Sequence, residues 1–324
     1  MNSLPLVTVI TPTYNRADYI VETIESVLSQ SYPNLEYIVL DDGSQDNSKE
    51  ILGRYTGRII WESHLNMGEV RTVNKGFEMT HGDIIGVVNS DDPLLPNAIA
   101  SIVEFMVKNP QIGVVYPDWN MIDADGKVID HIQTFDYSYI NMLRWHHCMP
   151  GPGTFFRKEI VDGLRGRDTQ FRYVSDFDFW LRAGLITRFA RLPKTLATFR
   201  VHPDSASVGE ANQNMAEEHI RLINKIFSLP NLSPNVLKIK REAYGSAYYI
   251  AGCVCRSCSN EIRSEYFWIA IKYSPLNYLK EYRKERLIAV MLRYLFPNLY
   301  LIWLAIKKAS RVIKFIKAKI DARN

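Results

Sequence analysis

The chain has 324 residues, of which 47% are hydrophobic and 23% charged, and its formal net charge is only +4. This length and apolar content suit a large folded core with an appended region, and they argue against a disordered chain. The charge is unevenly placed, because nine lysines and arginines lie from residue 286 onward against a single acid, Asp321.

Residues 1–90 alternate apolar runs typical of buried strands with helical patterns. The apolar runs begin at Val7, Tyr37 and Ile84, and a polar loop follows each of them. Between the first two runs, Ile20 and Ile24 fall on one face of a predicted helix. This order predicts a doubly wound α/β half-domain with a mostly parallel sheet, in which ligands bind beyond the carboxyl ends of the strands.

Two acidic pairs follow predicted strands. Asp41 and Asp42 end the second run, just before Gly43, which suits a tight turn. Asp91 and Asp92 follow the third. Because neighbouring side chains leave a strand in opposite directions, one carboxylate can bind a divalent metal while the other faces a sugar hydroxyl. Hard cations with oxygen ligands commonly hold diphosphates, so the two pairs favour a diphosphate site over solvated turns.

The rest of the chain first continues the α/β pattern and then becomes helical. Further short strands are expected at residues 112–116, 154–157, 188–193 and 196–199. Residues 119–153 are predicted to be irregular and rich in aromatic side chains. A helix is expected from Ser175, with Asp176 near its N-terminus and Phe177 on its apolar face. The pattern after about residue 210 is helical to the end, interrupted by prolines.

Eight segments occur in the order found in family 2 glycosyltransferases. They are Val7–Asn15, Ser29–Tyr32, Asp41–Ser44, Asn66–Gly68, Asn74–Gly76, Asn89–Asp92, Ser175–Arg182 and Arg200–His202. Together they resemble a family 2 glycosyltransferase with the GT-A fold over residues 6 to about 207. On this basis we expect residues 1–207 to form the catalytic domain and residues 208–324 a helical region with a basic amphipathic tail.

The resemblance implies a role for each matching residue. The nucleotide-sugar site would contain Pro12, Tyr14, Asp42, Asn74 and Asp91. A Mn²⁺ or Mg²⁺ ion would be held chiefly by Asp92, with Asp91 and His202 as further ligands. Asp176 would be the catalytic base that removes the acceptor's proton, a step worth roughly a hundred- to ten-thousand-fold in rate.

The chain departs from the family's pattern at positions that matter for these roles. Asn89 occupies the first position of the Asp-X-Asp motif, so metal binding falls to the two aspartates that follow. Val73 stands where many relatives have arginine, so a diphosphate contact would come from elsewhere, with Arg71 and Lys75 as candidates. Ser175 replaces a usual glutamate beside the base; Asp178 is the alternative base and is expected to be structural.

The implied activity is the inverting transfer of a sugar, with a UDP-sugar favoured as donor, to a hydroxyl of a glycan or lipid-linked acceptor. Such an enzyme would serve cell-surface polysaccharide or lipopolysaccharide assembly. The alternative is a catalytically weak glycosyltransferase-like scaffold in a membrane glycan-assembly complex. A nucleotidyltransferase would need a Gly-rich loop after the first strand, and an oxidoreductase would need Gly-X-Gly-X-X-Gly there; the chain has Thr11–Asn15 instead.

The basic tail suggests where such an enzyme would work. Isoleucines such as Ile313 and Ile320 share one face of the predicted helix, and lysines occupy the other, as in helices that lie in a membrane interface. We expect a cytoplasmic protein that is peripheral on the inner face of the membrane, with an anionic lipid surface as partner. The same tail could pack on the catalytic domain or form a homodimer. Nucleic acid is not expected, because the basic residues form no broad face.

The four cysteines suggest neither a disulfide scaffold nor a zinc site. Cys148 is alone, whereas Cys253, Cys255 and Cys258 cluster within a predicted helix. Three thiols without a fourth ligand make a poor structural zinc site. We expect packed thiols in a reducing cytosol. The N-terminus shows no basic segment followed by an apolar one, so no secretory signal is predicted.

Overall fold

The computed structural model describes residues 4–203 and 211–275 of the chain. Two compact units can be distinguished. Of the described residues, 4–143, 147–203, 211 and 224–229 form the first, and 144–146, 212–223 and 230–275 form the second.

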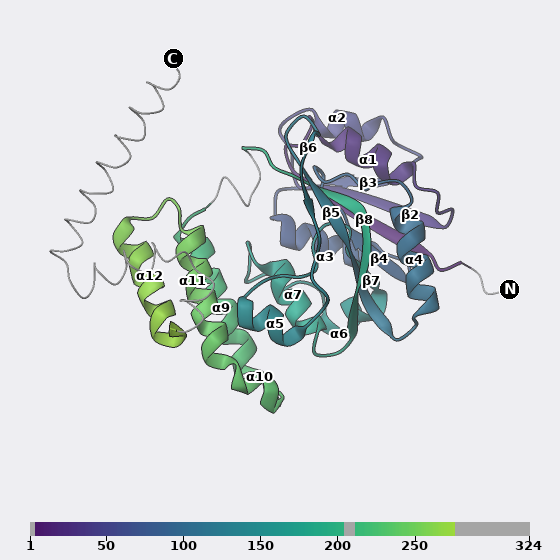
Figure 1. Ribbon diagram of the computed structural model, residues 1–324. Coiled ribbons are helices and arrows are strands. Elements are labelled where there is room, and N and C mark those ends of the chain that lie inside the picture. The colour runs from purple at the N-terminus through teal and green to yellow at the C-terminus, as the bar shows by residue number, and fades with distance from the viewer. Residues whose placement is uncertain (1–3, 204–210, 276–324) are drawn as a thin grey trace, which may run out of the picture. The chain divides into compact units, whose positions relative to one another are not determined.

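The first half of the first unit alternates strand and helix in the predicted order (Figure 1). Its elements are β1 (Val7–Thr13), α1 (Ile20–Leu28), β2 (Leu35–Asp41), α2 (Ser48–Gly53), β3 (Ile60–Ser63), α3 (Glu69–Met79) and β4 (Ile84–Val87). Strand β1 lies between β2 and β4 and is parallel to both, and β2 is parallel to β3. The carboxyl ends of these four strands therefore meet at one edge of the sheet.

The second half extends the same sheet with antiparallel pairings. It contains α4 (Ala98–Lys108), β5 (Ile112–Ile122), β6 (Val128–Ile132), α5 (Tyr139–Trp145), β7 (Phe155–Arg157), α6 (Lys158–Leu164), α7 (Ser175–Ala183) and β8 (Arg188–Arg200). The strand order is β3-β2-β1-β4-β7-β5-β6, and β8 pairs with β5. Strand β7 is antiparallel to β4 and β5, whereas β8 is parallel to β5. The mostly parallel, helix-flanked sheet confirms the predicted fold class.

Two details of this half differ from the sequence prediction. Residues 119–153 are not irregular throughout, because β5 continues to Ile122 and forms an antiparallel pair with β6. A turn at residues 123–126 joins these strands, and the amide of Gly126 donates to the carbonyl of Asp123 at 3.1 Å. The two short strands expected between residues 188 and 199 are one strand, β8, whose pairing with β5 shifts register near Pro117 and Asp118.

The core fills both faces of the sheet. On one face Val7 and Val9 of β1 belong to the same buried cluster as Ile24 of α1. On the other face α3 approaches closely, since a Cβ added at Gly76 would lie 2.5 Å from the Ile10 side chain. Burying each such aliphatic side chain is worth about 1.5–3 kcal/mol, which explains why the central strands are apolar on both faces.

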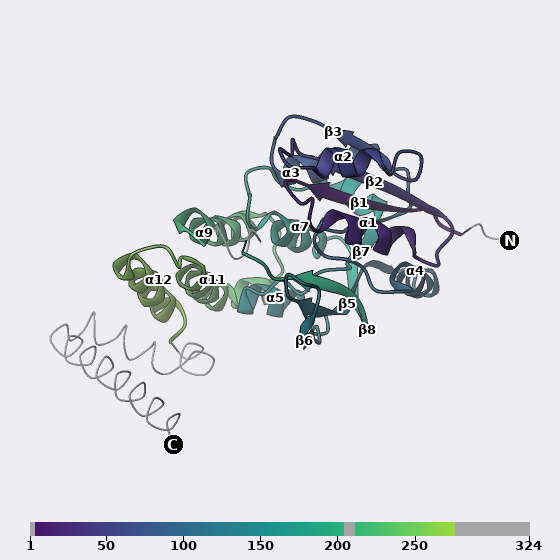
Figure 2. The same ribbon diagram turned by 90° about the horizontal axis from the view of Figure 1, so that it is seen from above.

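The second unit is helical. It contains most of α9 (Gln213–Ser228), and also α10 (Pro234–Lys238), α11 (Lys240–Val254) and α12 (Asn260–Tyr273). Helices α11 and α12 lie side by side in both views (Figures 1 and 2). Their close approach depends on Gly252, where an added Cβ would lie 2.7 Å from the ring of Phe267.

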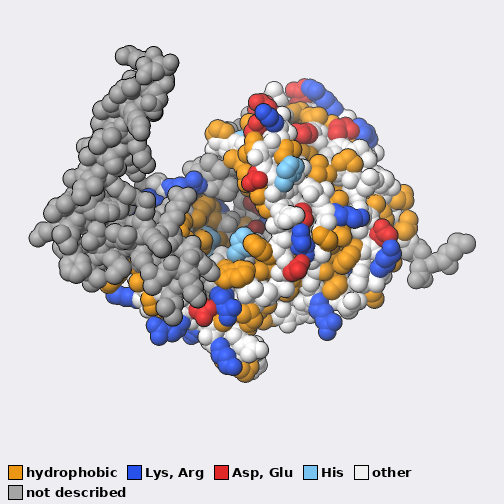
Figure 3. Space-filling model, in the orientation of Figure 1, with side chains coloured by type: hydrophobic (Ala, Val, Ile, Leu, Met, Phe, Trp, Pro, Cys, Tyr) orange, Lys and Arg blue, Asp and Glu red, His pale blue; other side chains and the backbone are white. Residues whose placement is uncertain are grey.

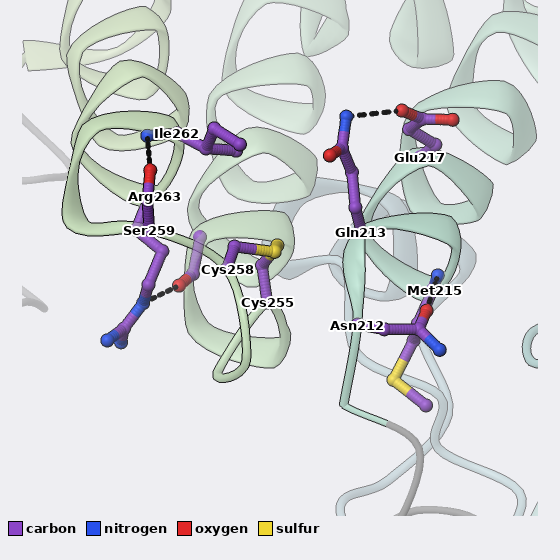
Figure 4. Close-up of a disulfide and its surroundings, with 10 residues drawn as sticks. Asn212, Gln213, Met215, Glu217, Cys255, Cys258, Ser259, Ile262 and Arg263 are labelled. Atoms are coloured by element: carbon purple, nitrogen blue, oxygen red, sulfur yellow. Dashed lines mark hydrogen bonds between the residues drawn. A yellow bond between two sulfur atoms is a disulfide. The ribbon is translucent and has the colours of Figure 1, made fainter.

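The cysteines of this unit correct the expectation of packed thiols. Cys255 and Cys258 form a disulfide in the turn between α11 and α12 (Figure 4). Cys255 follows the last residue of α11, so the cluster is not inside one helix. Cys148 and Cys253 are not disulfide-bonded. Two further contacts shape this turn: Ser259 accepts a hydrogen bond from the amide of Ile262, and Arg263 donates to the carbonyl of Gly252.

The predicted membrane helix falls outside the described residues. Within residues 4–203 and 211–275, no helix is both long and apolar enough to cross a membrane. On the visible face of the first unit, basic and acidic side chains are interspersed (Figure 3).

Candidate active site

The loops after β1 and β2 are clamped to each other. Asn15 has a positive φ of 51°, its amide donates to Oγ of Ser44 at 2.9 Å, and its Oδ1 accepts from the amide of Gln45 at 2.8 Å. Gly43 also has a positive φ, and a Cβ there would lie 2.8 Å from the backbone nitrogen of Asn66. The clamp holds the exposed ring of Tyr14 close to the turn that carries Asp42.

Asp42 is buried and fixes the segment that leads into α3. Its amide donates to the carbonyl of Thr13, so it lies opposite the end of β1. Its two carboxylate oxygens accept from the amides of Met67, at 2.7 Å, and Gly68, at 3.0 Å. Oδ2 keeps a second lone pair that can accept from a ligand, whereas Oδ1 also lies 3.5 Å from Nδ1 of His64. Pro12 is buried in β1, two residues before Tyr14.

Asp92 is held by two donors from different parts of the chain. Its carboxylate is only 5% exposed. Oδ1 accepts from the backbone amide of Arg200 at 2.8 Å, and Oδ2 accepts from Nδ2 of Asn89 at 2.9 Å. Asn89, a departure from the family's pattern, therefore orients the carboxylate that follows it.

Asp91 lies between an arginine and a histidine. Its Oδ2 is 3.3 Å from Nε of Arg16 and 2.9 Å from Nε2 of His202. The ring of His202 also packs on Tyr19, with 4.7 Å between the ring centroids. The structure therefore brings together Tyr14, Asp42, Asp91, Asp92 and His202 at the edge where β1, β2 and β4 end.

Arg200 joins this site together, although the sequence suggested no role for it. The residue is 2% exposed, its Nε donates to the carbonyl of Asp91 at 3.0 Å, and its Nη1 donates to the carbonyls of Asp123 and Ala124. Its Nη2 pairs with Glu22. The sequence could have pointed to Arg200, because it belongs to the same matching segment as His202.

The two neighbouring carboxylates favour a cation. Burial and the charge of Asp91 raise the pKa of Asp92 to about 8. A divalent cation would relieve this repulsion, and carboxylate oxygens with an imidazole nitrogen are a donor set that Mn²⁺ accepts. Among the described residues, no three or more His, Cys, Asp or Glu side chains are arranged as a metal site. Asp91, Asp92 and His202 lie near one another but do not by themselves form a metal site, so bound phosphate oxygens would have to supply further ligands.

Asp176 and Asp178 occupy contrasting positions on α7. Asp176 is exposed in the first turn, and its Oδ1 accepts from the amide of Phe177 at 2.7 Å. Asp178 is fully buried and pairs with Nε of Arg182 at 2.8 Å and with Nζ of Lys225 at 2.5 Å. These contacts agree with a structural role for Asp178 and leave Asp176 accessible to a substrate.

Asn74 holds the backbone of Arg167, in the loop that leads to α7. Its Nδ2 donates to the carbonyl of Arg167, and its Oδ1 accepts from the amide of the same residue, both at 2.8 Å. Arg167 and Asp176 both act electrostatically on the thiol of Cys148, whose pKa burial raises. In the described part of the chain, no hydrogen bond or ion pair joins Asp176 directly to Asp42, Asp91 or Asp92.

Residues 8–165 match the family described as "Glycosyl transferase family 2". The chain is 26% identical over 214 residues to the hyaluronan synthase of Pasteurella multocida, an alignment that covers 64% of this chain and 22% of that protein. Hyaluronan and chondroitin synthases are among the first curated relatives, and the chain spans only about a quarter to a third of their length.

Solved glycosyltransferases share the fold. S. aureus TarS 1–349 in complex with UDP-GlcNAc aligns with a TM-score of 0.59 and 17% identity, over 89% of this chain and 91% of that one. The mannosyltransferase PcManGT from Pyrobaculum calidifontis, in complex with GDP-Man and Mn²⁺, aligns with a TM-score of 0.58 and 17% identity, over 94% and 87%. Residues 8–165, which begin in β1, therefore form a domain of glycosyl transferase family 2.

Proposed function

We propose that the chain is an inverting glycosyltransferase that moves a sugar from a UDP-sugar to a hydroxyl of a glycan or lipid-linked acceptor in polysaccharide assembly. The observation that carries the proposal is the meeting of Tyr14, Asp42, Asp91 and Asp92 where parallel strands end. Two likenesses support it: one relative is named for a polysaccharide, hyaluronan, and one solved structure of similar fold holds UDP-GlcNAc.

The donor's base would bind between the first two loops. Tyr14 offers an exposed aromatic face for stacking, and Asp42 offers lone pairs that can accept from a ring N–H. Uracil and guanine both carry such a donor, so the panel described below includes both bases.

The diphosphate would lie toward the carboxylate pair. Asp91, Asp92 and His202 would hold a Mn²⁺ or Mg²⁺ ion there, which supplies positive charge that stabilises the departing diphosphate. Asn89 and Arg200 orient the carboxylate of Asp92 without contacting the substrate.

Asp176 would act on the acceptor. The acceptor oxygen forms a bond to the anomeric carbon from the face opposite the diphosphate, so the configuration inverts. The bond from that carbon to the diphosphate oxygen breaks, and its electron pair leaves with the diphosphate. The hydroxyl proton passes to the carboxylate of Asp176.

A calorimetric panel tests the proposal. UDP, GDP, UMP, uridine, UDP-GlcNAc and GDP-mannose are titrated into the wild type and Asp92→Ala, each with Mn²⁺ and with EDTA. We expect one base to bind, with a diphosphate affinity that rises with Mn²⁺ in the wild type only. If no nucleotide binds to folded wild-type protein, the glycosyltransferase proposal is wrong. If a nucleotide sugar binds but is never hydrolysed or transferred, the scaffold alternative is correct.

A further inference from the structure

The loop between α6 and α7 is held from three directions. Both backbone polar groups of Arg167 bond to the side chain of Asn74, which lies 93 residues earlier. Arg182 donates to the carbonyls of Leu164, at 3.1 Å, and Gly166, at 2.9 Å. Lys225 pairs with Asp168 at 2.7 Å. Helices α3, α7 and α9 thus fix this loop, whose Phe171 and Val174 are buried.

The backbone of this loop is strained where it approaches Asn74. Arg165 has a positive φ of 57°, and Gly166 follows with a φ of 80°. A Cβ at Gly166 would lie 2.6 Å from Oδ1 of Asn74, so glycine is needed for the contact. A non-glycine residue in this conformation costs about 1–3 kcal/mol and persists only where its surroundings impose it, often at functional sites.

This arrangement presents the guanidinium of Arg167 in a largely buried position. The side chain is 10% exposed, and its Nη1 donates to Oε1 of Glu69 at 3.1 Å. Within residues 4–203 and 211–275, its Nε and Nη2 make no hydrogen bond. Arg167 is nine-tenths buried, and its partner Glu69 is half exposed. The unused N–H donors of its guanidinium can therefore bind another anion.

Arg167 lies between the two ends of the proposed substrate site. Glu69 begins α3 directly after Gly68, whose amide bonds to Asp42 on the base side. On the other side, the charge of Arg167 lowers the pKa of the Cys148 thiol and the charge of Asp176 raises it. A nucleotide diphosphate sugar that spans from Asp42 to Asp176 would therefore place its phosphates near this guanidinium.

Three other cations near this edge are already paired with acidic side chains. Arg16 pairs with Asp91, and Arg200 is buried against Glu22. Lys75, one of the two candidates from the sequence, pairs with Glu62 at 2.6 Å. Arg71, the second candidate, is an exposed side chain on α3.

We propose that Arg167 binds the diphosphate of the sugar donor and that Glu69 occupies the guanidinium until the donor arrives. The inference rests on the proposed function and deepens it by assigning a residue to the phosphates. A guanidinium suits this task because its planar donors bind two phosphate oxygens at once. Glu69 would compete with the diphosphate, so its charge would lower donor affinity.

Calorimetry with UDP, UMP and uridine in Mn²⁺ tests the assignment, with GDP, GMP and guanosine used instead if the wild type prefers guanine. We expect Arg167→Gln to weaken diphosphate binding about 10- to 100-fold and to leave nucleoside binding within about twofold, since a charge-assisted hydrogen bond is worth about 1.5–3 kcal/mol. Arg167→Lys should lie between the two, and Glu69→Gln should bind the diphosphate more tightly than the wild type.

Arg54→Gln is the matched control, because it removes an arginine from a surface Arg–Glu pair, with Glu50 at 2.7 Å. It should bind every ligand as the wild type does. An unchanged diphosphate affinity in Arg167→Gln, an equal loss for the nucleoside, or a loss in Arg71→Gln instead would overturn the inference. If Arg167→Gln does not fold, Arg167→Lys and Glu69→Gln decide it. A wild type that binds no nucleotide overturns the proposed function as well.

Discussion

The backbone amide of Arg200 donates to Oδ1 of Asp92 at 2.8 Å, although 108 residues separate the two in sequence. The side chain of Arg200 turns back and donates to the carbonyl of Asp91. The end of β8 therefore supports the carboxylate pair from behind, through one residue that offers both its backbone and its guanidinium. Such supporting contacts set how accurately a metal-binding side chain is placed.

Replacing Arg200 by methionine, which keeps much of its length, should lower the free energy of unfolding by about 3 kcal/mol. The carbonyls of Asp91, Asp123 and Ala124 would each lose a donor. Nucleotide affinity in Mn²⁺ should fall in the protein that remains folded. Denaturant unfolding and calorimetry measure the two effects.

Glu22→Gln is the control for this variant. Glu22 is about half exposed, so its ion pair with Arg200 is screened by water and should contribute less than about 1 kcal/mol. If Glu22→Gln destabilises the protein as much as Arg200→Met does, the ion pair, and not the contacts to the carboxylate loop, is what Arg200 supplies.

Asp42 could be predicted from the sequence as a site residue, whereas the role of Arg200 could not. Asp42, Asp91 and Asp92 each follow an apolar run, and local periodicity together with the rule for parallel strands predicts that they meet. Arg200 reaches Asp92 only because β8 runs parallel to β5 over ten paired positions or more, a pairing that no local pattern encodes. The same applies to Arg167, whose position depends on Asn74.

Strand β6 was missed for a different reason. Four of its five residues, Val128–His131, are exposed, so the alternation of apolar and polar residues that marks a half-buried strand is absent. The disulfide between Cys255 and Cys258 was missed because it forms in the turn after α11, and the apolar pattern had placed both thiols within a helix.

Asp176→Asn and Asp178→Asn should separate catalysis from stability on one helix. Asp176→Asn should lower kcat by about a hundred- to ten-thousand-fold and leave donor affinity unchanged, because a carboxamide cannot accept the acceptor's proton. Asp178→Asn should lower the free energy of unfolding by about 3–5 kcal/mol, because Arg182 and Lys225 lose a buried counter-charge. Single-turnover kinetics and denaturant unfolding test both.

The opposite pattern would reassign the base. If Asp178→Asn folds normally and loses turnover while Asp176→Asn keeps it, the buried carboxylate is the proton acceptor. A loss of donor affinity in Asp176→Asn would instead place this side chain against the sugar nucleotide.

Removing metal should reveal the repulsion between the two carboxylates. Asp92→Asn should be at least as stable as the wild type in EDTA at pH 8, because Asp91 no longer faces a second buried charge. Added Mn²⁺ should raise the unfolding midpoint of the wild type in the presence of nucleotide and leave that of Asp92→Asn unchanged. Thermal unfolding checks this; equal stabilisation of both proteins by Mn²⁺ would show that the ion binds elsewhere.

The second unit should weaken in mild acid through a buried histidine pair. Nε2 of His146 lies 2.9 Å from Nδ1 of His219, and such a contact needs one nitrogen without a proton. Burial lowers the pKa of both rings, that of His219 to about 4. An unfolded histidine titrates near 6.5, so the stability from this pair is complete above that pH and is lost as the pH falls toward 4.

The lowered pKa of His219 alone should make the free energy of unfolding on the order of 2 kcal/mol lower at pH 5 than at pH 7.5. Denaturant titrations followed by circular dichroism at the two pH values measure this difference. His219→Gln should show a smaller difference, whereas His131→Gln, at an exposed position in β6, should behave as the wild type. A pH dependence that is the same in all three proteins would assign the acid sensitivity to carboxylates and not to the buried imidazoles.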